Sequence, residues 1–462
     1  MSKLRPTALL QAFMTASSAF IRVGGRGGAA LRTPSTLRMA QVDTGGLGAP
    51  DICVLGGGFG GVYTALGLSK LDWGDSPRPR ITLVDQQDRF VFLPMLYEVT
   101  TGTASCWEVA PQFEEVLAGS GIEFVQGTVA GLDTESRLVR VTGATPGEER
   151  SLPYDACVLA LGAEAKPNSV PGAAEHARRF YTLDDALALR RELQALRAQR
   201  RSGMVRVAVV GSGYVGTELS ANLASWLGPN ELMVTLVGSS DSIVHDGLPF
   251  SRGVAKEELD ARGIELVLDT KVSQVDATGL TLQPAGDASP YRLEADLVVW
   301  TAGTRPAAVA CDASLPVAED GRLAIEPTLA VRGSPRLFAL GDMAACVDGP
   351  GGVARSPSTA QAAMQQADYA AWNVRAALRG DEALLPYRYA NLGEMLSLGD
   401  AAGSVSSLGL INLKGPLASA ARRAIYAARM PTPQIAARVG LSWGLDTVLS
   451  AVRRATKDDG KK

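Results

Sequence analysis

The sequence predicts an α/β protein built from two Rossmann-like dinucleotide-binding domains, with the second inserted into the first. An apolar strand, a G-x-G-x-x-G turn and a helix follow one another twice, at residues 51–68 and 205–223. Each copy is followed by a second apolar strand, at residues 81–84 and 233–237. Further apolar strands that end at glycine complete the two sheets, at residues 154–163, 297–303 and 336–342.

The first glycine turn has the spacing of a dinucleotide site. Gly56 permits a tight turn, Gly58 lets the backbone approach a pyrophosphate, and Gly61 lets helix and strand pack closely. Asp85 ends the second strand, where a carboxylate takes ribose hydroxyls, and Asp342 could accept from a ribityl hydroxyl, so this site suits FAD. A purely structural turn is the alternative, but the order of strand, glycines, helix, strand and acid argues against it. The residues expected to contact FAD are Gly56, Gly58, Phe59, Gly60, Gly61, Asp85, Pro94, Leu96, Gly162, Gly341 and Asp342.

The second glycine turn differs from the first where the acid should stand. The turn at 211–216 repeats the spacing, but Gly238 follows the second strand. A carboxylate there would repel a 2′-phosphate, so its absence admits NADPH as well as NADH, with Ser239 and Ser240 as candidate donors. Alternatively, Asp241 supplies the acid from a shifted loop. The residues expected to contact NADH or NADPH are Gly211, Gly213, Tyr214, Gly216, Gly238, Ser239 and Gly303.

A long helix follows the last strand of the first domain. Ser356 is expected to be its N-cap and Pro357 its first helical residue. Its alanine- and glutamine-rich face, including Gln361 and Gln365, suits a cavity wall, and its N-terminus could stabilise negative charge on a reduced flavin. An ordinary solvated helix face is the alternative.

Composition argues against several functions for this chain of 462 residues. A net charge of −3 gives no reason to expect nucleic acid. The five cysteines form no C-x-x-C and the two histidines are far apart, so neither a metal site nor a Ser-His-Asp hydrolase is expected. No apolar run reaches the roughly 18 residues that a membrane-spanning helix needs.

Both ends of the chain differ from the middle. Up to Gln41 the chain has basic residues and no acid, which is typical of an organelle transit peptide, with a disordered basic tail as the alternative. Composition alone does not separate chloroplast from mitochondrion. Residues 418–430 and 433–452 combine apolar residues at helical spacing with arginines, which favours helices in a membrane interface. The competing interpretation is a homodimer contact or a pair of core helices.

Two dinucleotide folds in one chain call for two dinucleotides, one held permanently and one that exchanges. Hydride would pass from nicotinamide C4 to flavin N5, and the protein would hold these atoms about 3–3.5 Å apart. We expect a transit peptide at 1–48, an FAD-binding domain in two parts at 49–178 and 309–385, an inserted NAD(P)H-binding domain at 179–308, and a C-terminal membrane-anchoring region at 386–462.

Six motifs carry a resemblance to a known family: Arg89–Phe92 with Pro94–Glu98, Gly211–Leu219, Val299–Gly303, Phe338–Asp342, Thr359–Gln365 and Asn391–Met395. From about residue 50 onward the chain resembles the type II NAD(P)H–quinone oxidoreductases, or alternative NAD(P)H dehydrogenases, and among them the plant-type chloroplast demethylphylloquinone reductases. The resemblance implies an FAD enzyme that reduces a membrane quinone without pumping protons. The quinone would be a phylloquinone precursor, plastoquinone or ubiquinone, at the thylakoid or plastoglobule surface or, alternatively, the mitochondrial inner membrane.

The same resemblance implies the catalytic residues. In that family the counterparts of Gln361 and Gln365 line the quinone site beside the flavin, and the counterpart of Glu218 lies near the nicotinamide and the quinone pocket. The C-terminal helices of the family dock the enzyme peripherally on one leaflet. Gly238 departs from the pattern, because NADH-selective members carry an acid there.

Two other functions compete with this one. A sulfide–quinone reductase shares the fold but needs cysteines that flank the flavin. Cys346 is near the right region, whereas Cys157 is expected inside a strand. A signalling or assembly factor similar to apoptosis-inducing factor would instead predict slow turnover with quinones and a stable reduced flavin–nicotinamide complex.

Overall fold

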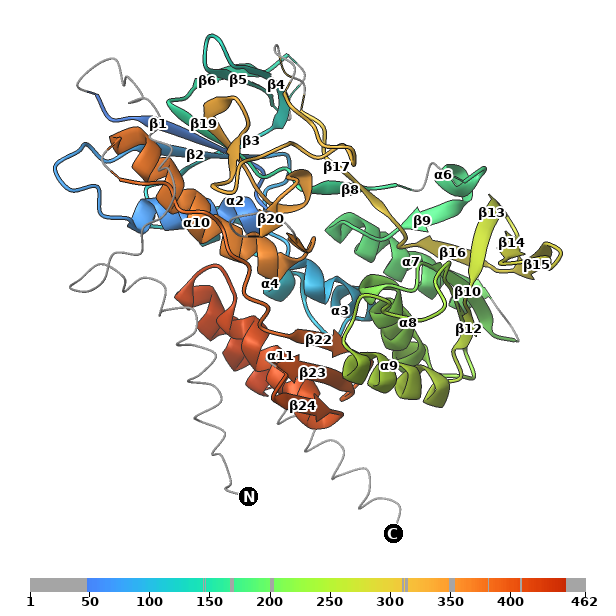
Figure 1. Ribbon diagram of the computed structural model, residues 1–462. Coiled ribbons are helices and arrows are strands. Elements are labelled where there is room, and N and C mark those ends of the chain that lie inside the picture. Colours follow the sequence, from blue (N-terminus) through green and yellow to red (C-terminus); the bar gives the residue numbers. More distant parts are fainter. Residues whose placement is uncertain are drawn as a thin grey trace. The chain divides into compact units, whose positions relative to one another are not determined.

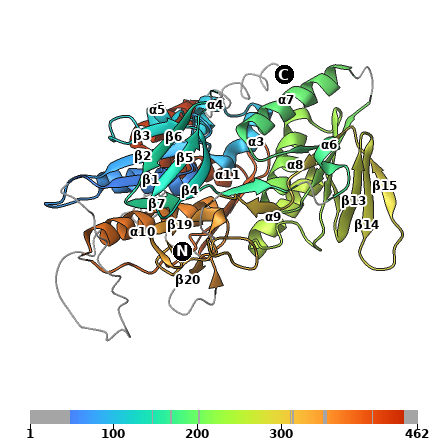
Figure 2. The ribbon, with the colours of Figure 1, turned by 90° about the horizontal axis from the view of Figure 1, so that it is seen from above.

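The computed structural model describes residues 48–445, with gaps at 144, 146, 167–169, 200–202, 310, 312–314, 349–353, 381 and 408. The chain divides into two units, Met39–Ser419 and a smaller one of Met1–Arg38 with Ala420–Lys462, and each is described by itself. The expected transit peptide lies outside the described residues except for Gly48. Figures 1 and 2 give two views of the elements and their labels.

The larger unit contains a six-stranded sheet in which five neighbouring strands are parallel and one edge strand is antiparallel to them. In spatial order the strands are β18 (Ala330–Val331), β19 (Ser334–Ala339), β7 (Ala156–Leu159), β1 (Asp51–Leu55), β2 (Arg80–Asp85) and β3 (Glu123–Gln126). The central strands β1 and β7 are almost wholly buried, as continuous apolar runs in a parallel sheet covered on both faces should be. The expected α/β class is confirmed.

A second sheet, of five parallel strands, repeats this plan. In spatial order its strands are β12 (Glu265–Val267), β11 (Leu232–Val237), β10 (Val205–Val210), β16 (Leu297–Trp300) and β9 (Ala177–Arg179). The last residues of β1 and β10 pair with Val84 and Val237 in the same register. Asp85 and Gly238 follow these two residues and therefore occupy equivalent positions.

Antiparallel strands complete the two halves and connect them. A three-stranded meander precedes β7 in the first half and β16 in the second. A short antiparallel pair lies where the chain passes between the halves, and a further three-stranded sheet lies near the C-terminus. The meanders are β4 (Thr128–Asp133), β5 (Leu138–Thr142) and β6 (Glu149–Pro153), and β13 (Thr270–Asp276), β14 (Gly279–Pro284) and β15 (Tyr291–Glu294). The remaining strands are β8 (Ala163–Ala165) with β17 (Thr304–Pro306), β20 (Val347–Asp348) with β21 (Ala354–Arg355), and β22 (Glu394–Ser397), β23 (Gly403–Ser407) and β24 (Ile411–Lys414).

A helix follows directly after β1 and after β10, and further helices lie along the two sheets. The longer ones are α2 (Phe59–Lys70), α7 (Leu183–Gln199), α8 (Tyr214–Leu227), α9 (Pro249–Ala261) and α10 (Ala360–Arg379). The shorter ones are η2 (Leu93–Met95), α3 (Leu96–Thr101), α4 (Cys106–Val109), α5 (Phe113–Val116), α6 (Ala173–His176) and η4 (Gly341–Met343). α10 packs on α2, where a β-carbon at Gly67 would lie 3.1 Å from that of Ala371.

The predicted start of α10 was wrong. The helix begins at Ala360, and its N-cap is Thr359, whose hydroxyl accepts from the N–H of Ala362 at 3.2 Å. Ser356 is instead buried, and its hydroxyl accepts from Gln366 Nε2 at 3.2 Å. A tertiary contact thus occupies the side chain that the local pattern assigned to the cap.

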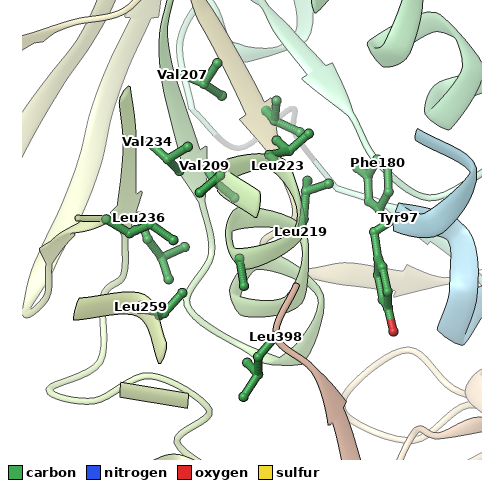
Figure 3. Packing of buried hydrophobic residues seen from close by; sticks show 14 of the residues in the cluster. Tyr97, Phe180, Val207, Val209, Leu219, Leu223, Val234, Leu236, Leu259 and Leu398 are labelled. Atoms are coloured by element: carbon green, nitrogen blue, oxygen red, sulfur yellow. The ribbon is translucent and has the colours of Figure 1, made fainter. Parts of the chain in front are cut away.

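A buried apolar cluster joins α8 to two other parts of the chain. Val207 of β10 and Leu219 of α8 belong to it, together with Tyr97 of α3 and Leu398, which follows β22. Figure 3 shows these side chains around α8. Burying a large apolar side chain contributes about 1.5–3 kcal/mol, so this cluster fixes α8 against both α3 and the C-terminal sheet.

The smaller unit contains the end of α11 (Pro416–Ala428) and a helical segment at 433–445. Within it, the guanidinium of Arg423 lies 5.9 Å from the ring centroid of Trp443, while Leu441 and Leu445 are exposed. The expected helix end beyond residue 445 lies outside the described residues. Within the described part of the chain, no helix is both long and apolar enough to cross a bilayer.

Asn373 offers a test of how the end of α10 is held. Its buried side chain donates to Thr328 O at 2.8 Å and to Leu385 O at 2.9 Å, and accepts from Leu385 N at 2.7 Å. Asn373→Leu keeps the volume but leaves three backbone groups unpaired, which should lower the free energy of unfolding by about 3 kcal/mol, at roughly 1 kcal/mol each. Scanning calorimetry beside the exposed control Asn230→Leu measures this, and an unchanged Tm for Asn373→Leu would contradict it.

Candidate functional site

Each glycine turn holds its helix tightly against the preceding strand. Gly56 and Gly211 have φ of +103° and +116°, a region that favours glycine. A β-carbon at Gly61 or Gly216 would collide with the carbonyl oxygen of the first glycine in the same turn. The fold itself therefore requires these four glycines, whatever the turn binds.

The middle glycine of each turn is required by neither the backbone nor its neighbours. Gly58 and Gly213 are the N-caps of α2 and α8, with φ of −78° and −75°, which any residue can adopt. A β-carbon at either position would meet no described atom within 4 Å. The first amide groups of each helix thus face open space, a cradle that fits the pyrophosphate of a dinucleotide.

Asp85 is fixed beside the first turn. Its Oδ2 accepts from the Gly57 N–H at 2.5 Å and its Oδ1 from the Gln87 N–H at 2.7 Å. Burial raises the pKa of the carboxyl, and the two backbone hydrogen bonds act in the opposite direction. This geometry holds the acceptor in the place from which a carboxylate binds ribose hydroxyls, so the first turn fits FAD.

Three strand-end glycines also follow the expected pattern. Gly162, Gly303 and Gly341 have φ of +72°, +71° and +72°, and no described atom would lie within 4 Å of a β-carbon at any of them. The N–H of Gly341 donates to Gln366 Oε1 at 2.7 Å, which fixes the turn that carries Asp342. Burial raises the pKa of the Asp342 carboxyl, which remains suited to accept from a ribityl hydroxyl.

The other residues expected near the first dinucleotide have packed side chains. The ring of Phe59 meets those of Phe90 and Phe92, in the loop after β2, edge-on, with ring centroids 5.1 Å and 5.2 Å apart. Leu96 belongs to the buried cluster around α8, and Pro94 lies in η2. A β-carbon at Gly60 would lie 3.0 Å from the Leu340 side chain. These positions offer a dinucleotide their backbone more than their side chains.

At the second turn, a serine side chain fills the space of the missing acid. A β-carbon at Gly238 would overlap Ser212 Oγ and lie 2.5 Å from Ser212 Cβ. In the first turn the residue equivalent to Ser212 is Gly57, whose N–H donates to the Asp85 carboxylate and whose missing side chain leaves room for the ring of Phe113. The two turns therefore differ at two positions that contact each other: the first has Gly57 and Asp85 where the second has Ser212 and Gly238.

The loop that follows Gly238 carries polar groups at its surface. Ser239 is exposed and Ser240 is half-buried. Asp241, the alternative acid, is exposed, and its Oδ1 lies 3.6 Å from Nδ1 of His245. A protonated imidazole at this distance would offset the charge of that carboxylate.

Glu218 lies buried where three parts of the chain meet. Its Oε1 accepts from the Tyr97 hydroxyl on α3 at 3.1 Å and from the Ser397 N–H on β22 at 2.8 Å. Asn222, one turn further along α8, donates to the Ser397 carbonyl at 3.3 Å. Tyr97 reaches this point with its hydroxyl directed away from Phe180 (Figure 3).

Gln361 and Gln365 fasten α10 to the segment 389–393. The amide of Gln361 makes three hydrogen bonds to this segment, at 3.0–3.2 Å. Gln365 accepts from the N–H of Ala390 at 2.9 Å and donates to its carbonyl at 2.8 Å. A quinone that touched either glutamine would therefore also border this segment.

Sequence reasoning assigned no role to Glu394, although its motif was noted. Its Oε2 accepts a short hydrogen bond from the Tyr214 hydroxyl, and its Oε1 accepts from the Leu248 N–H at 2.8 Å. Burial, and then the Glu394 carboxylate, hold the pKa of Tyr214 well above its usual range. Ser212, Gln366 and Tyr97 were likewise given no role, because no local pattern predicts their contacts with Gly238, Ser356 and Glu218.

Two of the five cysteines, Cys53 and Cys157, are unsuited to sulfur chemistry. Cys53 and Cys157 are cross-strand neighbours inside the first sheet. Burial raises the pKa of Cys53 to about 12 and that of Cys157 well above its usual value, so both thiols stay protonated and unreactive. Within the same part of the chain, no group of three His, Cys, Asp or Glu side chains could hold a metal ion.

Comparison with known proteins agrees with this geometry. Residues 50–367 match the family model of the pyridine nucleotide-disulphide oxidoreductases. The chain is 42% identical to demethylphylloquinone reductase NdbB of Synechocystis sp., over 85% of this chain and 95% of that protein. It is 39% identical to the chloroplastic/mitochondrial alternative NAD(P)H-ubiquinone oxidoreductase C1 of Arabidopsis thaliana, over 87% and 82%.

Solved structures share the fold at low sequence identity. NDH2 from Plasmodium falciparum in complex with NADH has a TM-score of 0.75 at 18% identity and covers 85% of this chain and 96% of its own. The sulfide:quinone oxidoreductase of Aquifex aeolicus has a TM-score of 0.67 at 18% identity, over 80% and 88%.

The two middle glycines provide a paired test of which turn holds which dinucleotide. Gly58→Val should leave the apoprotein's Tm unchanged but retain about a tenth or less of the flavin, because the side chain fills the phosphate cradle. Gly213→Val should remain yellow but lose reduction by NADH and NADPH. Visible absorbance, calorimetry and anaerobic reduction measure these outcomes.

The matched control is Gly61→Ala, which should destabilise the fold itself because its methyl group meets the Gly56 carbonyl. A Gly58→Val protein that keeps its flavin, or a Gly213→Val protein that loses it, would show that the two turns have been assigned wrongly.

Proposed function

Because the chain belongs to the pyridine nucleotide-disulphide oxidoreductase family, and within it to the type II NAD(P)H:quinone oxidoreductases, we propose that it reduces a membrane quinone with NADH or NADPH. FAD is its resident cofactor and is expected on the first turn, with residues 49–178 and 309–385. NAD(P)H is expected on the second, with residues 179–308. The reaction pumps no protons.

The observation that carries this proposal is the difference between two otherwise equivalent turns. Both have an open cradle at the helix N-terminus, at Gly58 and Gly213. The first holds a fixed carboxylate at Asp85, whereas the second has Gly238 in the same register. A protein with two such sites binds two dinucleotides, and we assign FAD to the first, which has the Asp85 acceptor and also places Asp342 after β19.

The chain's own groups would position the reactants. Bound FAD supplies the two-electron chemistry between nicotinamide and quinone. Helix α8 presents its N-terminus to the phosphates of NAD(P)H, and Glu218 lies one turn further along that helix. Glu218, Gln361 and Gln365 are the residues that we assign to the quinone side, where Tyr97 and Ser397 orient the Glu218 carboxylate.

For the substrate, we infer a naphthoquinone of the phylloquinone-precursor class, with plastoquinone or ubiquinone as the other outcomes of a test. Support comes from the two relatives, one described as a demethylphylloquinone reductase and the other as chloroplastic/mitochondrial. We infer a chloroplast location at the thylakoid or plastoglobule surface, with the mitochondrial inner membrane as the alternative.

Peripheral membrane association is part of the proposal. In the larger unit, Leu410 and Leu417 are 85% and 73% exposed, and in the smaller unit Leu441 and Leu445 are 70% and 64% exposed. Large apolar side chains exposed near arginines are typical of an interfacial surface. A homodimer contact would use the same side chains, and analytical ultracentrifugation with and without vesicles separates the two.

The direct experiment is steady-state oxidation of NADH and NADPH by the purified yellow protein, with naphthoquinone and benzoquinone acceptors in parallel. We expect rapid turnover with quinone and preference for a naphthoquinone. Turnover with every quinone slower than reoxidation by dissolved oxygen would contradict the function.

The acid position gives a sharper test of nucleotide choice. Gly238→Glu alone would overlap the Ser212 side chain, so the informative variant is Ser212→Gly/Gly238→Glu, which removes the overlap and puts a carboxylate at the position equivalent to Asp85. It should lose NADPH activity by about 100-fold or more while keeping NADH activity, because juxtaposed like charges cost several kcal/mol. Values of kcat/KM for both nucleotides measure this.

Ser212→Gly alone is the control and should keep both activities. Undiminished NADPH use by the double variant would refute the role given to position 238.

A further inference from the structure

We propose that Glu394 is a positioning residue for the nicotinamide nucleotide, acting through Tyr214 and Leu248 to hold the loop 239–248 closed over the second glycine turn. The inference rests on the proposed function, because it takes the second turn as the NAD(P)H site. Glu394 is in the C-terminal sheet, whereas the phosphates of the nucleotide are expected on the second glycine turn. The C-terminal sheet would therefore contribute to nucleotide binding from outside the domain that holds the phosphates.

The carboxylate of Glu394 joins two helix N-termini. Tyr214, which donates to Oε2, is the first residue of α8, and Leu248, which donates to Oε1, is the N-cap of α9. Negative charge is favoured beside helix N-termini, and both oxygens have a donor. The side chain therefore ties the start of the nucleotide-binding helix to the end of the loop that follows β11.

The loop itself is held under strain. Val244 is buried with φ of +46°, a left-handed conformation that is rare for a β-branched residue. Its N–H donates to the Ser212 carbonyl at 2.7 Å, and its own carbonyl accepts from the Gly247 N–H at 2.8 Å. Such a conformation persists where the surroundings hold it in place, and the Leu248–Glu394 bond lies directly beyond Gly247.

The loop also lies against Tyr214. A β-carbon at Gly247 would be 3.2 Å from the Tyr214 hydroxyl oxygen. The loop is thus fastened twice to the second turn, by Val244 to Ser212 and by Leu248, through Glu394, to Tyr214. Without Glu394 the second fastening is lost, and the strained segment gains freedom to open.

Two residues of strand β22 form hydrogen bonds with different residues on one face of α8. Tyr214, Glu218 and Asn222 follow one another at intervals of four residues, so they share that face. Glu394 bonds the first of them, whereas Ser397 bonds the other two. Removing the Glu394 side chain should therefore disturb the nucleotide site and leave the surroundings of Glu218 in place.

The experiment compares Glu394→Ala, Glu394→Gln and Glu394→Asp in the FAD-loaded enzyme. Calorimetry measures the Kd of NADP⁺, steady-state kinetics give KM for NADPH and for a naphthoquinone, and hydrogen exchange reports on the amides of residues 241–248. The matched control is Glu257→Gln, which removes an exposed 3.0 Å ion pair between α9 and Lys414 of the same C-terminal sheet.

Glu394→Ala should raise the Kd of NADP⁺ and the KM of NADPH by about tenfold, with faster exchange in the loop, since one charge-assisted hydrogen bond and one to a backbone amide are lost. The KM for quinone should change by less than about twofold, which separates this role from a general loss of packing. Glu394→Gln keeps the length of the side chain, whereas Glu394→Asp keeps its charge but is one methylene shorter. Glu394→Gln should therefore bind NADP⁺ more tightly than Glu394→Asp. Tyr214→Phe combined with Glu394→Ala should be less than additive.

The proposal is overturned if Glu394→Ala binds NADP⁺ as the wild type does, or if the KM for quinone rises as much as that for NADPH. It is also overturned if Glu257→Gln has the same effect. A wild-type protein that binds NADP⁺ but does not reduce quinones would count against the proposed function and leave the binding test intact.

Discussion

The structure depends on one close backbone approach, made twice. In each turn the third glycine lies so near the carbonyl of the first that no side chain fits between them. This contact fixes the helix N-terminus at the end of the central strand, so its unpaired amide groups face outward from the sheet edge. The neighbouring strands then bring their own terminal residues to the same edge, and the proposed dinucleotide contacts follow from that placement.

Because the scaffold is repeated, small differences between the copies carry the chemical distinction between the sites. At the first turn a glycine–aspartate pair gives a fixed acceptor, whereas at the second a serine–glycine pair fills the same space with a neutral hydroxyl. The backbone register is the same in both. The second turn therefore lacks the charge of the first although the backbone register is the same, and the proposed difference in nucleotide rests on this contrast.

The turns, both sheets and the acid position could be predicted because their signals are local: glycine spacing, apolar runs and the residue that follows a strand. The start of α10 could not, because Gln366 takes the Ser356 hydroxyl. The contacts that surround Glu218 and Tyr214 were beyond local reasoning, since they join residues 121, 179 and 180 positions apart. A pattern of single residues shows which groups exist, and tertiary packing decides which of them meet.

The segment 389–397 connects the half of the protein that contains the first glycine turn to the half that contains the second. Its first half is bonded by Gln361 and Gln365 of α10, which packs on the first sheet's helix α2. Its second half, β22, is bonded by Tyr214 and Glu218 of α8, the helix of the second turn. Together with the crossing at β8 and β17 and the packing of α3 on α7 and α8, this segment connects the two halves. Hydride transfer needs reacting atoms within about 3–3.5 Å, so a link that fixes one half against the other contributes to catalysis even where it touches neither reactant.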